Sequence, residues 1–206
     1  MKVKTKFTPL LHGYYFPNRF EFKGFTKIIK SLNNSLIYGM CGGMVFTALD
    51  HYFDQKNIPD YGFVNDLPLS YTKYLWKRQT ESVSFAVLLK IIQFAAISAS
   101  KSLQKSFEVE LPIVIDRLND GLPSPIVIIR SSLFQNPTHN HQVLVTGYVE
   151  TSSFLEFSLY DPNHPKQDPK LIITKQPASI IQSTGEPVRG FFLNHYSYQF
   201  SQNPDD

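Results

Sequence analysis

Cys41 is the only cysteine of this 206-residue chain, and it lies in the segment YGMCGGM (38–44) directly before an apolar run. The run 44–53 predicts a buried helix, which would place the thiol at a helix N-terminus. The unpaired N–H groups and the dipole at that end favour a thiolate over a thiol. Glycines at 39, 42 and 43 leave room for backbone and substrate near the sulfur. This context predicts a nucleophile; the alternative is a small buried apolar side chain.

Two further residues could act on that thiol. His141 begins a predicted strand (142–149), and Asp161 follows the next predicted strand (154–160). A short turn between the strands makes them antiparallel, so the start of the first lies beside the end of the second. Cys41, His141 and Asp161 would then supply a nucleophile, a base and a group that orients the base. Asp161 has an alternative interpretation as a turn residue, since Asp-Pro-Asn favours turns.

The elements that must position these residues fall into two halves of one predicted domain, residues 1–206. Residues 1–120 are mainly helical and residues 121–206 mainly strand, which predicts an α+β fold with a cleft between the halves. We expect Asp50, late in the first long helix, to be a surface or peripheral contact residue, and residues 1–30 to be irregular apart from a short helix. The other expected helices cover 26–32, 71–78, 85–103 and 116–119, and the expected strands cover 125–130, 142–149, 154–160, 171–174 and 190–196.

Composition describes a globular chain with a net charge of +3. Residues 1–30 carry seven Lys or Arg against Glu21, but these charges are spread among aromatic residues, so no nucleic-acid partner is expected. One cysteine excludes an intramolecular disulfide framework. No segment has the pattern of a signal peptide or a membrane span. We therefore expect a cytoplasmic protein, or one exported without a classical signal peptide; oligomeric state stays undetermined.

Three pieces of sequence, in this order, resemble the papain-like cysteine peptidase fold and, within it, the C39 and C39-like bacteriocin-processing peptidases. They are GMCGG (39–43) leading into a helix, H-x-V-x-V-x-G-Y (141–148) on a strand, and YDP (160–162) closing the next strand. The resemblance implies a Cys helix packed on an antiparallel sheet, a cysteine hydrolase with a protein or peptide substrate, and no cofactor. Papain-like enzymes place a Gln about six residues before the cysteine to bind the oxyanion. Ser35 stands at that position, directly after Asn34, so Asn34 and Ser35 are the oxyanion candidates.

Three alternatives use the same residues. A glutamine deamidase or transglutaminase-type acyl transferase would use the same triad, and an inactive binding module would keep only the fold. The third is a metal site on the His-x-His pair His139 and His141, completed by Asp161 and His164. No second ligand cluster accompanies that pair, and we expect no metal.

Overall fold

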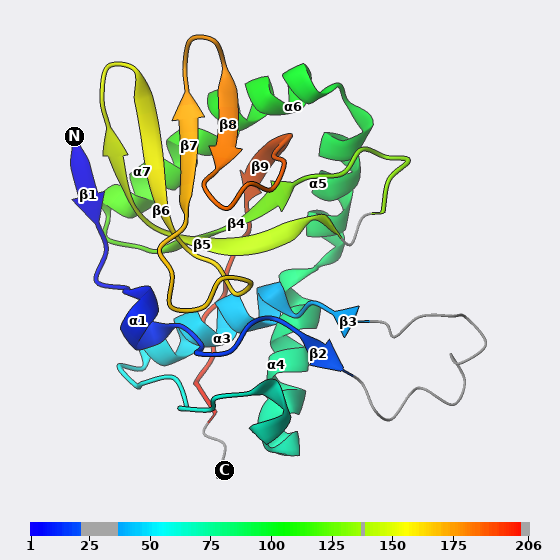
Figure 1. The fold of residues 1–206 in the computed structure, drawn as a ribbon, viewed down its shortest axis with the longest axis vertical. Coiled ribbons are helices and arrows are strands. Elements are labelled where there is room, and N and C mark those ends of the chain that lie inside the picture. Colours follow the sequence, from blue (N-terminus) through cyan, green and yellow to red (C-terminus); the bar gives the residue numbers. More distant parts are fainter. Residues whose placement is uncertain (22–36, 137–138, 203–206) are drawn as a thin grey trace.

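The computed structural model describes residues 1–21, 37–136 and 139–202. It has an α+β fold built on a seven-stranded antiparallel sheet in the order β8-β7-β6-β5-β4-β9, with β1 also paired to β5 (Figure 1). The strands of this sheet are β1 (Lys2–Lys4), β4 (Ser124–Ile129), β5 (His141–Glu150), β6 (Phe154–Tyr160), β7 (Lys170–Thr174), β8 (Ser179–Gln182) and β9 (Gly190–Leu193). A separate two-stranded sheet pairs β2 (Phe20–Glu21) with β3 (Ile37–Tyr38) just before the cysteine.

Helices cover both faces of the sheet, as the alternation along β4 shows. Ile126 and Ile128 pack in a cluster with α7, whereas Val127 and Ile129 pack with α5. α3 contacts the sheet through a third cluster that includes Leu144. The helices are α1 (Pro9–His12), α3 (Cys41–Phe53), η1 (Val64–Asp66), α4 (Leu69–Ser82), α5 (Phe85–Ala96), α6 (Ala99–Lys105), η2 (Ser106–Glu110) and α7 (Leu111–Asn119).

α3 is the helix that carries the cysteine, and it is enclosed on nearly every side. All residues from Cys41 to His51 are buried, both the apolar side chains and the polar Thr47, Asp50 and His51. α4 packs against it, and the strand β5 lies beside it. The helix therefore has little freedom to move relative to the sheet.

The expectation for 85–103 was wrong, because this segment forms two helices rather than one. Ile97 is extended (φ −88°, ψ 163°), and the Ser98 side chain accepts a hydrogen bond from the N–H of Lys101, which starts a new helix. Residues 1–21 were expected to be irregular, yet they contain β1, α1 and β2. The strand β8 was not expected at all, and the helix expected over 26–32 lies outside the described residues.

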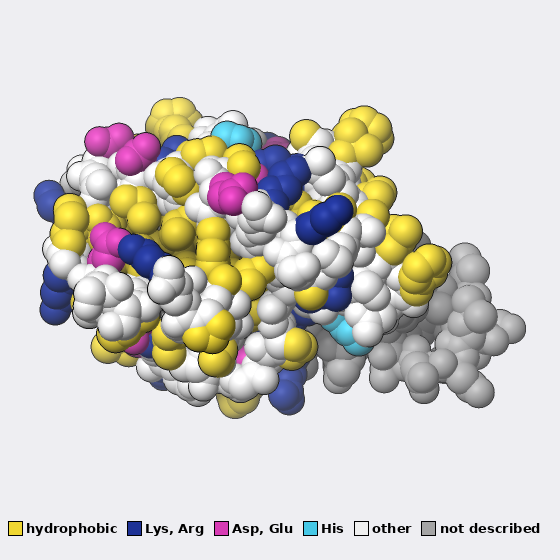
Figure 2. Space-filling view, turned by 90° about the horizontal axis from the view of Figure 1, so that it is seen from above, with side chains coloured by type: hydrophobic (Ala, Val, Ile, Leu, Met, Phe, Trp, Pro, Cys, Tyr) yellow, Lys and Arg dark blue, Asp and Glu magenta, His cyan; other side chains and the backbone are white. Residues whose placement is uncertain are grey.

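The free edge of β9 is covered by side chains of the helical segment behind it. The Ser106 hydroxyl accepts a hydrogen bond from the N–H of Phe191 (2.8 Å) and donates one to its carbonyl (3.0 Å), and the Glu110 carboxylate accepts the N–H of Leu193 (3.0 Å). These three bonds occupy backbone groups of Phe191 and Leu193 that an exposed edge strand would offer to another chain. At the end of the sheet seen in Figure 2, apolar side chains are visible among scattered charged ones. The half-buried Leu103 and Phe107 belong to the cluster between the sheet and these helices.

Candidate active site

The thiol of Cys41 lies at the first residue of α3, where the first N–H groups of a helix have no partner within the helix. The side chain is 9% exposed. Two main-chain N–H groups donate to the sulfur: that of Gln142, at 3.4 Å, and that of Gly42. The N-terminus of α3 therefore meets the start of β5 at the sulfur atom.

Two of the glycines around Cys41 serve helix packing. A Cβ on Gly42 would lie 2.0 Å from the Ser82 hydroxyl oxygen, and one on Gly43 would lie 2.4 Å from the carbonyl oxygen of Leu75. Only glycine lets α4 approach this closely. The close approach of backbone that the sequence predicted is therefore present at Gly43, where it comes from α4. Gly39 is different, since it is exposed and the nearest described atom to a Cβ there would be Nδ2 of Asn18, at 2.9 Å.

His141 and Asp161 lie together at the same end of the sheet as the sulfur. β5 and β6 pair antiparallel with Leu144 opposite Tyr160, so the start of β5 lies beside the end of β6. The Nε2 atom of His141 lies 2.6 Å from Oδ1 of Asp161. The thiol of Cys41 hydrogen-bonds the same imidazole, which leaves the Nδ1 side of the ring for the sulfur. The three residues are thus joined as the sequence predicts.

The electrostatics of the three groups favour a charged pair. Burial lowers the pKa of His141, but the carboxylate of Asp161 and the sulfur of Cys41 outweigh it and raise the pKa to about 10. Burial raises the pKa of Cys41, yet His141 and the two N–H donors bring the pKa below its ordinary value. The pKa of Asp161 is held below its usual range, because His141 and the N–H of Asn163 outweigh the effect of burial. At neutral pH these shifts favour a thiolate, an imidazolium and a carboxylate.

Asn18 is a buried residue of this site that the sequence did not reveal. Its Oδ1 accepts the N–H of Met40 (2.5 Å), and its Nδ2 donates to Oδ1 of Asn163 (3.1 Å). Its own N–H donates to the carbonyl of Pro162 (2.9 Å). One side chain therefore ties the residue before Cys41 to the turn that carries Asp161. The signal in the sequence was weak, because an Asn after a Pro is ordinary in a loop.

Replacing Asn18 with alanine is expected to loosen this tie. The alkylation rate of Cys41 at about pH 6 should fall about three- to tenfold, because the N–H of Met40 and the Asn163 amide lose a buried partner. The same change at the exposed Asn57 serves as the control. An Asn18→Ala variant that alkylates like the native protein would show that the tie has no effect on the thiol.

The oxyanion candidates Asn34 and Ser35 lie outside the described residues, so the structure does not place them. The described residues do supply one donor that the sequence suggested. The main-chain N–H of Cys41 is at the start of α3, where helix geometry directs N–H groups out of the helix end. Such a group is a suitable donor to a developing oxyanion.

The metal interpretation finds no support among the residues that the structure describes, because no three His, Cys, Asp or Glu side chains converge there. His164 pairs instead with Glu186, whose Oε1 lies 2.9 Å from its Nε2. The backbone N–H of His139 bonds the carbonyl of Asn136. The side chain of His139 is exposed, whereas that of His141 is buried beside Asp161.

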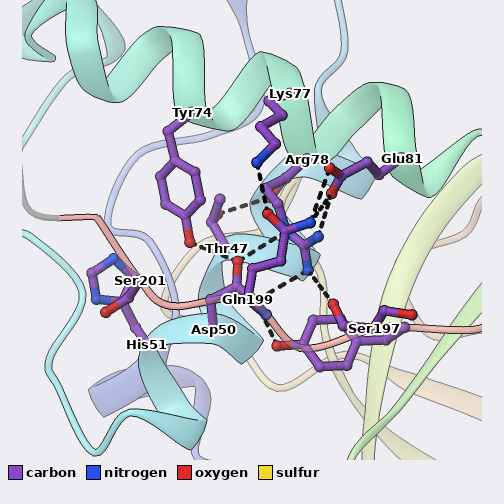
Figure 3. Close-up of polar contacts among 12 residues, drawn as sticks. Thr47, Asp50, His51, Tyr74, Lys77, Arg78, Glu81, Ser197, Gln199 and Ser201 are labelled. Carbon is purple, nitrogen blue, oxygen red and sulfur yellow. Dashed lines mark hydrogen bonds and ion pairs between the residues drawn. The ribbon is translucent and has the colours of Figure 1, made fainter.

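A buried ion pair joins α3 to α4 near the C-terminal end of α3 (Figure 3). Nε of Arg78 lies 2.9 Å from Oδ2 of Asp50, and the hydroxyls of Tyr74 and Tyr196 donate to the same carboxylate at 2.6 and 2.5 Å. Arg78 also donates to the carbonyl of Ser197 (2.8 Å) and so binds the C-terminal segment. The expectation that Asp50 is a surface residue was wrong, since it is fully buried. The Asp50 carboxylate can be buried because Arg78, on α4, supplies its counter-charge.

His51 belongs to a second buried polar group. Its Nε2 lies 3.0 Å from the hydroxyl of Tyr71, which in turn hydrogen-bonds the hydroxyl of Tyr14 (2.7 Å). Burial lowers the pKa of His51 to about 4, so the ring is neutral at neutral pH. This histidine is therefore a neutral core residue, held through its Nε2.

No protein-family model, no curated protein and no solved structure matches this chain. Among the residues that the structure describes, no helix has the length and apolar character needed to cross a bilayer.

Proposed function

We propose that the protein is a cysteine hydrolase that cleaves an amide or ester bond of a protein or peptide, on a papain-like arrangement of a Cys helix and an antiparallel sheet. The observation that carries the proposal is the joined triad. Cys41 hydrogen-bonds His141, and Nε2 of His141 lies 2.6 Å from Asp161. A lone structural cysteine needs neither a basic imidazole nor a carboxylate beside it. The perturbed pKa values of all three groups support a chemical role.

The geometry assigns a role to each group. The thiolate of Cys41 attacks the carbonyl carbon, and the oxyanion that forms accepts the N–H of Cys41. The imidazolium of His141 gives its proton to the leaving amine or alcohol as the C–N or C–O bond breaks, which leaves a thioester. Neutral His141 then removes a proton from water, whose oxygen attacks the thioester. Loss of the acid product restores the thiolate, and the proton that His141 took from water restores the imidazolium. Asp161 keeps the ring oriented throughout.

The pH dependence of Cys41 alkylation tests the first requirement of this mechanism. An ordinary thiol with a pKa of about 8.5 reacts with iodoacetamide only as it ionises near that pH. Because the pKa of Cys41 is lowered, its rate should stay high well below that pH and fall only as acid protonates the sulfur. Intact mass gives the rate directly, because the chain has one cysteine. A profile that follows an ordinary thiol would remove the case for a nucleophile.

The alkaline side of the profile separates the nucleophile from the acid. The pKa of His141 is raised to about 10, so the imidazolium is present below that pH and is lost above it. Alkylation needs only the thiolate and should continue above about pH 10, whereas turnover of an ester or amide substrate needs the proton and should decline there. The pH values at which alkylation and turnover change are properties of the Cys41–His141 pair rather than of either residue alone. Parallel decline of alkylation and turnover above that pH would contradict the assignment of His141 as the acid.

A further inference from the structure

The carboxylate of Asp161 has a second buried partner besides His141. Gln182, the last residue of β8, is fully buried, and its Nε2 donates to Oδ2 of Asp161 at 2.9 Å. Oδ1 of the same carboxylate already faces His141 and accepts the N–H of Asn163 at 2.8 Å. Donors therefore approach both oxygens of Asp161, from three different segments of chain.

Arg130 fixes which way the Gln182 amide points. Its Nη2 donates to Oε1 of Gln182 at 2.8 Å. A guanidinium has only donors, so it must face the amide oxygen, and the amide nitrogen must then face the carboxylate. The Arg130 side chain is 11% exposed and lies 3.9 Å from Glu186, which also pairs with His164. Arg130 is thus held on its outer side as well.

Sheet topology explains why these residues meet. Ile180 and Gln182 lie two positions apart on β8 and so share one face of the sheet. Gln182 is opposite Leu171 at the start of β7, next to the loop that begins at Asp161. Arg130 follows directly after β4, whose last pair with β5 is Ile128 opposite His141. Strand ends from β4, β5, β6 and β8 therefore converge at the carboxylate.

We propose that Gln182 is a positioning residue for the triad: it holds the plane of the Asp161 carboxylate toward His141, with Arg130 orienting the Gln182 amide. This inference rests on the proposed function, since it assigns no group that touches substrate. Without the Gln182 donor, the buried Oδ2 loses its partner, and only the contacts of Oδ1 still restrain the plane of the carboxylate. The imidazolium is then less well stabilised, and so is the thiolate that depends on it.

The test compares Gln182→Met with the native protein. Methionine has a similar length and volume but no donor, and the expected result is an alkylation rate of Cys41 that is about tenfold lower at about pH 6. The pH at which the rate falls should move upward, which a purely structural role would not cause. Ile180→Met is the matched control, because Ile180 is buried on the same strand and is not hydrogen-bonded to Asp161. It should keep the native pH profile.

Arg130 supplies a second, independent variant pair in case Gln182→Met does not fold. Arg130→Lys keeps a cation that can face the amide oxygen and should retain most of the native rate at about pH 6, whereas Arg130→Met should lose about two- to threefold. Native pH profiles in Gln182→Met, or in Arg130→Met where the first does not fold, would overturn the inference. That outcome differs from failure of the proposed function, in which the native protein itself would show the profile of an ordinary thiol.

Discussion

Replacing His141 with alanine is expected to lower the alkylation rate of Cys41 about a hundredfold at about pH 6. The His141 imidazole contributes both a hydrogen bond and a positive charge to the thiolate. Without them, only the N–H groups of Gln142 and Gly42 oppose the burial that raises the pKa of the thiol. An ordinary thiol is less than about 1% ionised at that pH. The measurement is the rate of iodoacetamide addition followed by intact mass, in both proteins, from acid to alkaline pH. At alkaline pH the two rates should converge.

His139→Ala is the control for this prediction. His139 lies two residues from His141 but is exposed, so replacing its side chain should leave most of the low-pH reactivity. An equal loss in both variants, restored by added zinc, would favour the metal interpretation instead. His141→Ala also leaves the buried Asp161 carboxylate without its charged partner, so melting curves are needed to confirm that the compared samples are folded.

The contact between His141 and Asp161 could be predicted from the sequence because it depends on local patterns. Two apolar runs separated by a short turn specify an antiparallel pair, and the strand register then brings their ends together. The apolar run after Cys41 likewise predicts a buried helix with the thiol at its start. These patterns repeat within a few residues and need no knowledge of the rest of the fold.

The supporting residues could not be predicted because each depends on packing between distant segments. Asn18 acts through a turn 145 residues away, and Gln182 acts from a strand that the sequence analysis did not expect. Asp50 was placed on the surface because a carboxylate in a helix is usually solvated. Its counter-charge, Arg78, is 28 residues away on α4, and no spacing rule connects the two. Ser98 was not recognised as the start of a new helix, although it separates the apolar segment 85–97 from the more polar segment 99–105.

Arg78→Met is expected to cost about 3–5 kcal/mol of unfolding free energy, because it leaves the Asp50 carboxylate buried without its counter-charge. Arg78 is 1% exposed and Asp50 fully buried, so water cannot take the place of the guanidinium. Arg78 also stacks over the rings of Phe46 and Tyr196, at 5.1 and 5.3 Å from their centroids, and those contacts are lost as well. Urea unfolding followed by circular dichroism measures the change.

Two further variants separate the charge effect from the loss of packing. Lys77→Met changes the neighbouring residue on α4, whose exposed amine bonds only the side chain of Gln199 among the described residues, and should cost less than about 1 kcal/mol. Arg78→Met combined with Asp50→Leu removes both charges and should recover a large part of the loss, since a buried pair replaced by apolar residues is often tolerated. If Arg78→Met alone costs less than about 1 kcal/mol, Asp50 does not depend on Arg78.

Asp50 lies nine residues beyond Cys41 on α3, so the folded fraction of every variant should keep the native alkylation profile. The buried ion pair would then determine the free energy of unfolding, and the triad would determine the reactivity of Cys41 at the first residue of α3.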